Sequence, residues 1–425
     1  MGIWNEPAGN TPVTGAQLGG RPAGLPPMPA SPPWQAPTDV EQGLYQARTR
    51  GDWAAYFDVL AATKLYHSMP REVADQLDGR VQRSSYWEPR TGTYCYAFWT
   101  HGMLPVPVPD QVFFRGGLGW IAEEWARSDV MLAVNPGTPC EAFFSATPAH
   151  RDIWQEHARR APTDKGGVLR TLRVGGPLEG EVARGLACGA LLCVSNGSIW
   201  NAMGWHGTGY VSERERLKEW WGITSHDDWK AAQESLLQGT SGSVWEFVLE
   251  IRRTLSRQYG GLIDVAHWRQ ATERVMRHNM ERVGGDESGT ADRADDLEAE
   301  VRRVQQLIGR ITRYEARFRA DGLLGEGKQV RSTLSWNFGR ASKMARWGLG
   351  ARYCDLEEAE WAVIRAGRVS RVNYKSWEDF SVGYILGRCL HFDEEEFGSW
   401  YQDMLDAHRI LMTAPESPWV TIPWK

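Results

Sequence analysis

The sequence predicts an α+β protein in which a small mixed α/β domain precedes a larger, all-helical domain. Residues 40–160 combine helical spacing of apolar residues with short aromatic or apolar runs, which indicates helices alternating with strands. Residues 182–425 show helical spacing almost throughout. The 425-residue chain also contains 22 tryptophans, and a large helical core is the expected place for so many indole rings.

The composition is that of a soluble globular protein, with 42% hydrophobic and 24% charged residues. The net charge of −5 gives no overall attraction to nucleic acid or to an anionic membrane, so neither is an expected partner. The longest apolar run, residues 186–194, is much shorter than the ~20 residues that a membrane-spanning helix needs. The six cysteines form no C-x-x-C pair, and the N-terminus has no basic segment followed by an apolar one. We therefore expect free buried thiols and a cytoplasmic location.

Residues 1–38 are expected to form a disordered or polyproline-like tail. They contain nine prolines and six glycines, carry almost no charge and show no periodicity. Trp4 and Trp34 are unusual in such a segment. They either anchor the tail on the folded body or on a partner, or they are stray aromatics in a solvated tail, which is the favoured interpretation.

The first folded domain covers residues 40–160. Four elements are expected in the order helix, strand, helix, strand: 40–60, 94–100, 119–127 and 129–134. Asn135, Pro136 and Gly137 stop the second strand with turn residues. Residues 161–181 are rich in Gly and Pro and form a connector, in which residues 168–174 have strand-like composition.

Two runs in this domain carry a resemblance to a known family. The strand YCYAFWTHGMLPVPVP, a helix and then MLAVNPGTPCEAFF are similar to the N-terminal domain of SseB-like proteins. In that family a strand ending in Phe-Thr is followed by a helix and by a strand ending in Asn-Pro-Gly. Here the first strand ends Phe98-Trp99-Thr100, which is a small departure from the pattern.

The second domain is expected to be helical over residues 182–425. Several helix starts have a Ser or Asp followed three residues later by an acid, the spacing of a capping box: Ser212/Glu215, Ser225/Asp228, Asp355/Glu358 and Ser376/Asp379. Residues 296–319 show the clearest helical period, with acids first and arginines later, which agrees with the helix dipole. Residues 284–295 are polar and are expected to form a loop.

The end of the chain carries a second resemblance. The stretches LSWNFGRASKMARWGLGARYCDLEEAEWAVIRAGRV, NYKSWEDFSVGYILGR and SPWVTIPW resemble the bacterial domain of unknown function typified by the YbeU and YbeR proteins. The resemblance covers roughly residues 195–424 and is strongest after Leu334. That domain has no agreed activity, so the resemblance implies a helical architecture and no chemistry.

Searches for catalytic, metal and cofactor motifs give no expected site. The glycine-rich loop at residues 204–210 precedes a helix and offers a place for a phosphate, but it lacks the spacing and the Lys of a P-loop, so a tight turn is favoured. His391 and His408 lie near carboxylates, but a helix cap and a core border explain them better than a metal site does. No G-x-S-x-G elbow is present, and Cys188 and Cys193 lack a nearby His that would activate a thiolate. We expect no catalytic residue, no metal and no cofactor.

Glycines beside Trp and Arg in the last helices point to close helix contacts or to a cleft, since Gly inside a helix costs about 1 kcal/mol relative to Ala. The candidate binding residues for such a cleft are Trp336, Arg340, Arg346, Trp347, Trp377 and Arg388. A structural role for them is the competing interpretation. Buried positions are expected for Trp336, Trp377 and Trp400.

A second candidate surface is the basic set on the long predicted helix. It comprises Arg302, Arg303, Arg310, Arg313 and Arg317. These arginines suit an acidic partner, although a solvated helix face is the commoner arrangement.

The favoured function is non-catalytic binding of another protein. The two resemblances imply a conflict or secretion setting, in which the protein is an immunity-type partner or a secreted cargo. The alternative is an unrecognised enzyme with its site in the Arg/Trp-lined cleft. A pocket with convergent His, Asp or Arg groups of perturbed pKa favours the enzyme, whereas an exposed plateau without a pocket favours the binding protein.

Overall fold

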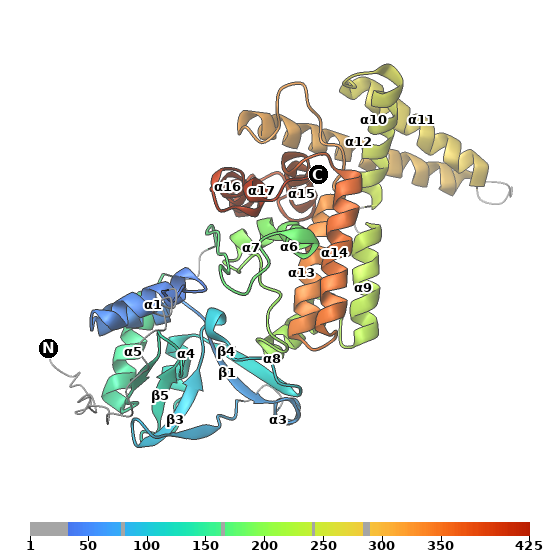
Figure 1. The fold of residues 1–425 in the computed structure, drawn as a ribbon. Coiled ribbons are helices and arrows are strands. Elements are labelled where there is room, and N and C mark those ends of the chain that lie inside the picture. The colour runs from blue at the N-terminus through green and yellow to red at the C-terminus, as the bar shows by residue number, and fades with distance from the viewer. Residues whose placement is uncertain (1–32, 78–80, 163–165, 240–242, 284–289) are drawn as a thin grey trace, which may run out of the picture.

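The computed structural model describes residues 33–77, 81–162, 166–239, 243–283 and 290–425 (Figure 1). Residues 1–32 of the expected tail, including Trp4, lie outside the described residues, as do residues 284–289 of the expected loop. Trp34 contacts Tyr45 with ring centroids 5.0 Å apart, so the end of the expected tail packs on the body. An N-terminal mixed α/β region is followed by an all-helical region, as the sequence predicts.

The α/β region places short helices around two small sheets. Its helices are α1 (Asp39–Thr49), α2 (Trp53–Ala61), α3 (Arg71–Gln76), η1 (His101–Met103), α4 (Leu118–Glu123) and α5 (Pro148–Arg160). Its strands are β1 (Leu65–Pro70), β2 (Ser85–Glu88), β3 (Thr93–Phe98), β4 (Gln111–Gly116), β5 (Met131–Val134) and β6 (Ala142–Phe144). The sheet orders are β1-β4 and β2-β3-β5-β6, and only the β3–β5 pair is parallel among the described strands.

Several predicted elements of this region need correction. The single helix predicted at 40–60 is two helices, because Gly51 takes a φ of +66° and the Asp52 carboxylate accepts from the Ala55 amide to start α2. Residues 168–174 form one bridge, Arg170 to Ile199, rather than a strand. At Leu172 a side chain satisfies both backbone polar groups: the Asn201 side-chain amide accepts from the Leu172 N–H at 2.7 Å and donates to the Leu172 carbonyl at 2.9 Å.

The helical region is drawn from green to red in Figure 1. Its helices are α6 (Gly180–Ala187), α7 (Ala190–Ser195), α8 (Tyr210–Trp221), α9 (His226–Gln238), α10 (Ser243–Tyr259), α11 (Val265–Val283), α12 (Thr290–Ala320), α13 (Leu334–Gly350), α14 (Leu356–Asn373), α15 (Trp377–Phe392), α16 (Ser399–Thr413) and α17 (Pro418–Thr421). None of the helices within the described ranges has the length and apolarity to cross a membrane.

Three of the four predicted helix starts are confirmed. Ser225 and Ser376 cap α9 and α15 through bonds to the backbone amide three residues on, and Asp355 forms a full capping box with Glu358. The prediction at Ser212 is wrong, because α8 begins earlier, after Gly209 in the left-handed conformation. The long helix predicted at 296–319 is α12, which begins at Thr290, so the predicted loop to residue 295 is too long.

Helix α13 lies at the centre of the helical region, between α9, α14 and α15, and nearly all of it is buried. The close helix contacts predicted from its glycines are confirmed. A Cβ built on Gly348 would lie 2.2 Å from Nε1 of Trp229, and one on Gly339 would lie 2.6 Å from the Tyr384 ring. Larger residues at these positions would force the helices apart.

Helices α6 and α7, which precede α8 in the chain, also pack on this core. A Cβ on Gly185 would lie 2.2 Å from the carbonyl oxygen of Val363, so α6 and α14 approach with backbone against backbone. Trp419 of α17 donates its indole N–H to the Ala187 carbonyl at 3.0 Å. Helix α6 therefore lies between α14 and the C-terminal segment.

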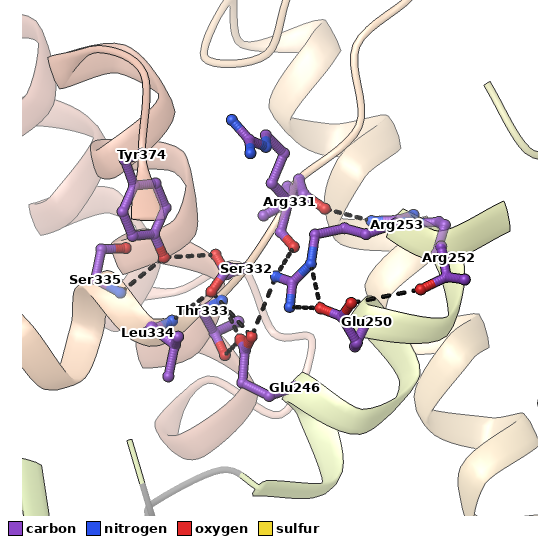
Figure 2. A network of polar contacts seen from close by, with 12 residues as sticks. Glu246, Glu250, Arg252, Arg253, Arg331, Ser332, Thr333, Leu334, Ser335 and Tyr374 are labelled. Atoms are coloured by element: carbon purple, nitrogen blue, oxygen red, sulfur yellow. Dashed lines mark hydrogen bonds and ion pairs between the residues drawn. The ribbon is translucent and has the colours of Figure 1, made fainter. Parts of the chain in front are cut away.

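The first turn of α13 is capped by a side chain from another helix. The Glu246 carboxylate of α10 accepts from the Thr333 amide at 2.5 Å, from the Thr333 hydroxyl at 2.7 Å and from the Ser332 hydroxyl at 2.9 Å (Figure 2). Arg253 lies beside it, and the Tyr374 hydroxyl accepts from the Ser335 amide at 2.8 Å. These contacts attach α10 to the start of α13.

The predicted burial is confirmed for Trp336 and Trp377 and is wrong for Trp400. Trp377 stacks on Trp419 at 5.4 Å and donates to the Ile422 carbonyl at 2.9 Å. Trp400 has 43% of its surface exposed, because the start of α16 turns it outward, where it stacks on Phe392 at 4.7 Å.

Candidate anion-binding cavity

A cavity of about 920 Å³ lies where the α/β region meets the helical region. Its walls come from the start of α1, the end of α2, the end of β4, the loop between α7 and α8, and α8 and α13. Segments from residue 38 to residue 350 thus surround one space. In Figure 1 this junction lies where α8 and β4 come together.

The two regions are fastened to each other beside the cavity. The Tyr210 hydroxyl of α8 donates to Asp75 of α3 at 2.6 Å, and Arg214 pairs with the same carboxylate at 2.7 Å. Arg352, after α13, donates to the Gln111 carbonyl of β4 at 2.6 Å. The cavity walls are therefore held by direct polar bonds between the regions.

The glycine-rich loop at residues 204–210 forms one wall. Gly207 has a φ of +74°, and a Cβ there would lie 2.7 Å from Val112, so the loop backbone lies directly on β4. The Phe113 amide donates to the Gly207 carbonyl at 2.8 Å. The glycines therefore have the structural role that the sequence favoured, and they also bring Thr208 and Trp205 to the cavity.

Four basic side chains, Arg115, Arg216, Lys343 and Arg346, gather on the cavity wall, and we call them the cationic cluster. Arg115 and Arg216 both pair with Glu213, the first at 3.4 Å. Within the described part of the chain, Lys343 and Arg346 have no carboxylate as an ion-pair partner. Four cations therefore share one carboxylate.

Arg346 and Lys343 are held in place by groups other than carboxylates. Arg346 donates to the Ile199 carbonyl at 2.6 Å and to the Trp200 carbonyl at 3.4 Å. Lys343 is only 3% exposed, and its ammonium lies 3.7 Å from the Cys193 sulfur. Main-chain carbonyls and the Cys193 sulfur thus fix the geometry of both cations, and among the described residues neither cation pairs with a carboxylate.

Three titratable groups in or beside the cluster have displaced pKa values. Burial lowers the pKa of Lys343 to about 8. Burial, followed by the charges of Arg346 and Arg115, lowers the pKa of His101 to about 4. Burial acts to raise the pKa of the Cys193 thiol, but Lys343 and Arg346 outweigh it, and the pKa is lowered.

The other charged residues of the cavity wall do not balance the positive charge of the cationic cluster. Lys64 and Arg170 add basic groups, and Asp39 and Glu41 add acidic ones. Asp39 pairs with Arg173 at 2.6 Å. Glu41 is fully buried and accepts from the Thr100 hydroxyl at 2.5 Å and from the Gly102 amide at 3.1 Å. The cavity keeps an excess of basic groups in a partly desolvated space.

The six residues predicted for an Arg/Trp cleft are distributed over four places. Arg346 and Trp347 line the cavity. Arg340 lies over the Trp336 ring at 3.4 Å, a cation–π contact in which burial lowers its pKa to about 10. Arg388 lies 5.0 Å over Trp400, and Trp377 belongs to the C-terminal Trp cluster.

The basic face predicted on α12 is largely neutralised within the chain. Arg303 pairs with Glu300, Arg313 with Glu395 and Arg317 with Asp321, at 2.8, 2.6 and 2.7 Å. Arg310 donates to the Leu390 carbonyl at 3.4 Å, and Arg302 is exposed.

Sequence reasoning missed most of the cluster, because Arg115, Arg216, Lys343 and Arg346 come from β4, α8 and α13. One signal was available. Lysine occurs at only eight positions in the chain, and Lys343 stands inside ASKMARW, among small and apolar residues of a buried helix. Burying a charged lysine in such a setting costs free energy unless a negative group compensates its charge.

Comparison with known proteins gives one family match, in the C-terminal half of the chain. Residues 216–424 match the model of a family described as "Protein of unknown function (DUF1266)". The match includes Arg216, Lys343 and Arg346 but not Arg115 or the glycine-rich loop. No curated protein and no solved structure matches the chain.

Proposed function

We propose that this protein binds a small anionic molecule in the cavity between its two regions. The observation that supports the proposal is that the four cations of the cationic cluster share a single carboxylate on a partly desolvated wall. Burying an ionised group without a counter-charge costs several kcal/mol. A negatively charged ligand would supply the missing counter-charge.

The chemistry of the cluster favours a ligand with phosphate or carboxylate groups. Guanidinium groups bind the oxygens of such groups in pairs, and an ammonium group acts as a compact point charge. Arg346 already uses part of its guanidinium on the Ile199 and Trp200 carbonyls, which fixes the remainder against the cavity. A ligand with more than one negative charge fits this set best.

An enzymatic function is the second candidate, and one observation favours it. The cavity contains convergent basic groups, and the pKa values of Lys343, His101 and Cys193 are all displaced. This is the pattern that we associate with an enzyme rather than with a flat binding surface.

Binding of another protein through α12, as an immunity-type partner or a secreted cargo, has less support. Three of the α12 arginines already have carboxylate partners in the chain. The resemblances to SseB-like proteins and to the YbeU/YbeR-type domain stay predictions.

The test uses inorganic pyrophosphate and citrate as probes, with the purified full chain. Calorimetric titration and thermal unfolding are measured at constant ionic strength in sodium chloride. We expect saturable binding and a higher Tm in wild type, because a ligand at 100 times its Kd stabilises by ~2.7 kcal/mol. Lys343→Met should weaken binding at least about tenfold, since one lost charge contact of ~1.5–3 kcal/mol has that size.

Arg303→Met is the matched control, because its side chain is 75% exposed on α12 and does not line the cavity. It should bind both probes as wild type does. The proposal would be rejected if neither probe bound saturably, or if wild type and Lys343→Met bound the probes equally.

A further inference from the structure

Cys193 has surroundings that set it apart from the other cysteines. It lies on α7, is fully buried, and faces two cations of α13: Nη1 of Arg346 at 3.2 Å and Nζ of Lys343 at 3.7 Å from its sulfur. The two cations are three residues apart and therefore share one helix face. A sulfur between two positive nitrogens is stabilised as the thiolate, which is the nucleophilic form of cysteine.

The other five cysteines provide an internal comparison. All are free and buried, and burial raises the pKa of each of them: Cys95, Cys140, Cys188, Cys354 and Cys389. Cys354 and Cys389 also lie near carboxylates, which disfavour a thiolate further. Cys193 is the one cysteine whose pKa is lowered.

We infer that Cys193 is a peroxide-reactive thiolate, placed behind Lys343 and Arg346 on the wall of the cavity. The inference goes beyond ligand binding and does not depend on it. The sulfur attacks one oxygen of hydrogen peroxide, so that an S–O bond forms and the O–O bond breaks. The sulfur loses two electrons, and the peroxide gains them. The departing hydroxide takes a proton from the Lys343 ammonium and leaves as water, and Cys193 becomes a sulfenic acid.

The buried position of the Cys193 sulfur limits which reagents can reach it. Lys343 and Arg346, the two cations beside Cys193, line the cavity. Lys343 has a flexible four-carbon chain that can shift. Hydrogen peroxide is small and uncharged, so a local side-chain movement admits it. Bulky thiol reagents need a larger opening and should react slowly with the folded chain.

The experiment compares all six thiols in the wild-type chain. The folded protein is exposed to hydrogen peroxide for a series of times, the excess is removed with catalase, and the chain is unfolded in dimedone to trap sulfenic acid. Mass spectrometry of the peptides then gives the oxidation rate at each cysteine. We expect Cys193 to react at least about tenfold faster than each of the other five, because it alone among the six thiols lies between two cations that stabilise the thiolate.

Because the comparison lies within one folded protein, it needs no variant. Oxidation of Cys193 at a rate equal to or below that of the others would overturn the inference. A second measurement tests the role of the cations: Lys343→Met should slow Cys193 and leave Cys389 unchanged, whereas an unchanged rate at Cys193 would remove Lys343 from the mechanism. Probe binding to the cavity plays no part in either readout, so the anion proposal and this inference fail separately.

Discussion

Replacing Glu246 by Ala should remove the cap of the central helix α13. Thr333 is the N-cap residue of α13, and its own side chain caps no amide of the helix. Its buried amide donates to the Glu246 carboxylate (Figure 2). The same carboxylate also accepts from the Thr333 and Ser332 hydroxyls.

The cost follows from these three contacts. A hydrogen bond to a charged group contributes ~1.5–3 kcal/mol, and a buried donor left without a partner costs ~1–3 kcal/mol. The two hydroxyls can turn toward other acceptors, so the contributions do not add fully. We expect Glu246→Ala to lower the free energy of unfolding by about 3–5 kcal/mol.

Glu250→Ala is the matched control, because Glu250 lies one turn further along α10 in the same network. Its side chain is 48% exposed, and it pairs with Arg253 and Arg257. Exposed ion pairs contribute ~0–1 kcal/mol, so this variant should stay close to wild type.

Urea unfolding followed by circular dichroism measures both variants, and hydrogen exchange locates the change. The amides of the first turn of α13 should exchange faster in Glu246→Ala than in Glu250→Ala. If the two variants unfold at the same urea concentration, the cross-helix cap does not stabilise α13 as we reason.

Three further predictions concern single positions. Lys343→Met should leave the ligand-free protein as stable as wild type or more stable, by thermal unfolding. Wild-type affinity for citrate should fall as the pH rises through about 8, where the Lys343 ammonium is lost, and stay flat in the variant. Gly185→Ala should destabilise by ~1–3 kcal/mol in urea unfolding, since its methyl group meets the Val363 carbonyl, whereas Gly261→Ala enters open space and should not. Burial lowers the pKa of His408 to about 4, so the unfolded chain takes up the proton first as the pH falls. The free energy of unfolding should therefore decrease by up to ~3 kcal/mol as the pH is lowered from about 6.5 to about 4. His408→Gln should flatten that slope in acid unfolding curves.

The parts of the fold that the sequence predicts are those with a local cause. Asp355 and Glu358 form their capping box within one turn, and Asn135 begins the predicted turn after β5, with a φ of +47°. Gly348 was expected at a close helix contact, because Gly inside a helix has a cost that needs a reason.

The parts that it missed depend on distant partners. Trp400 has the helical spacing of a core residue, but the orientation of α16 in the fold decides that it faces outward. Cys193 was set aside because no His is near it in sequence. The groups that change its chemistry, Lys343 and Arg346, lie 150 and 153 residues further along the chain. Spacing along a sequence does not report such neighbours.

The position of α6 has a consequence for how this protein can be divided. The family match begins at residue 216, within α8, yet the Gly185 backbone lies against α14 and the Ala187 carbonyl receives the Trp419 indole. A fragment cut at the family boundary would expose the apolar faces of α14 and α17 that α6 covers. The family match is therefore shorter than the set of helices that pack together, and a helical fragment that keeps the contacts of α6 has to start no later than Gly180.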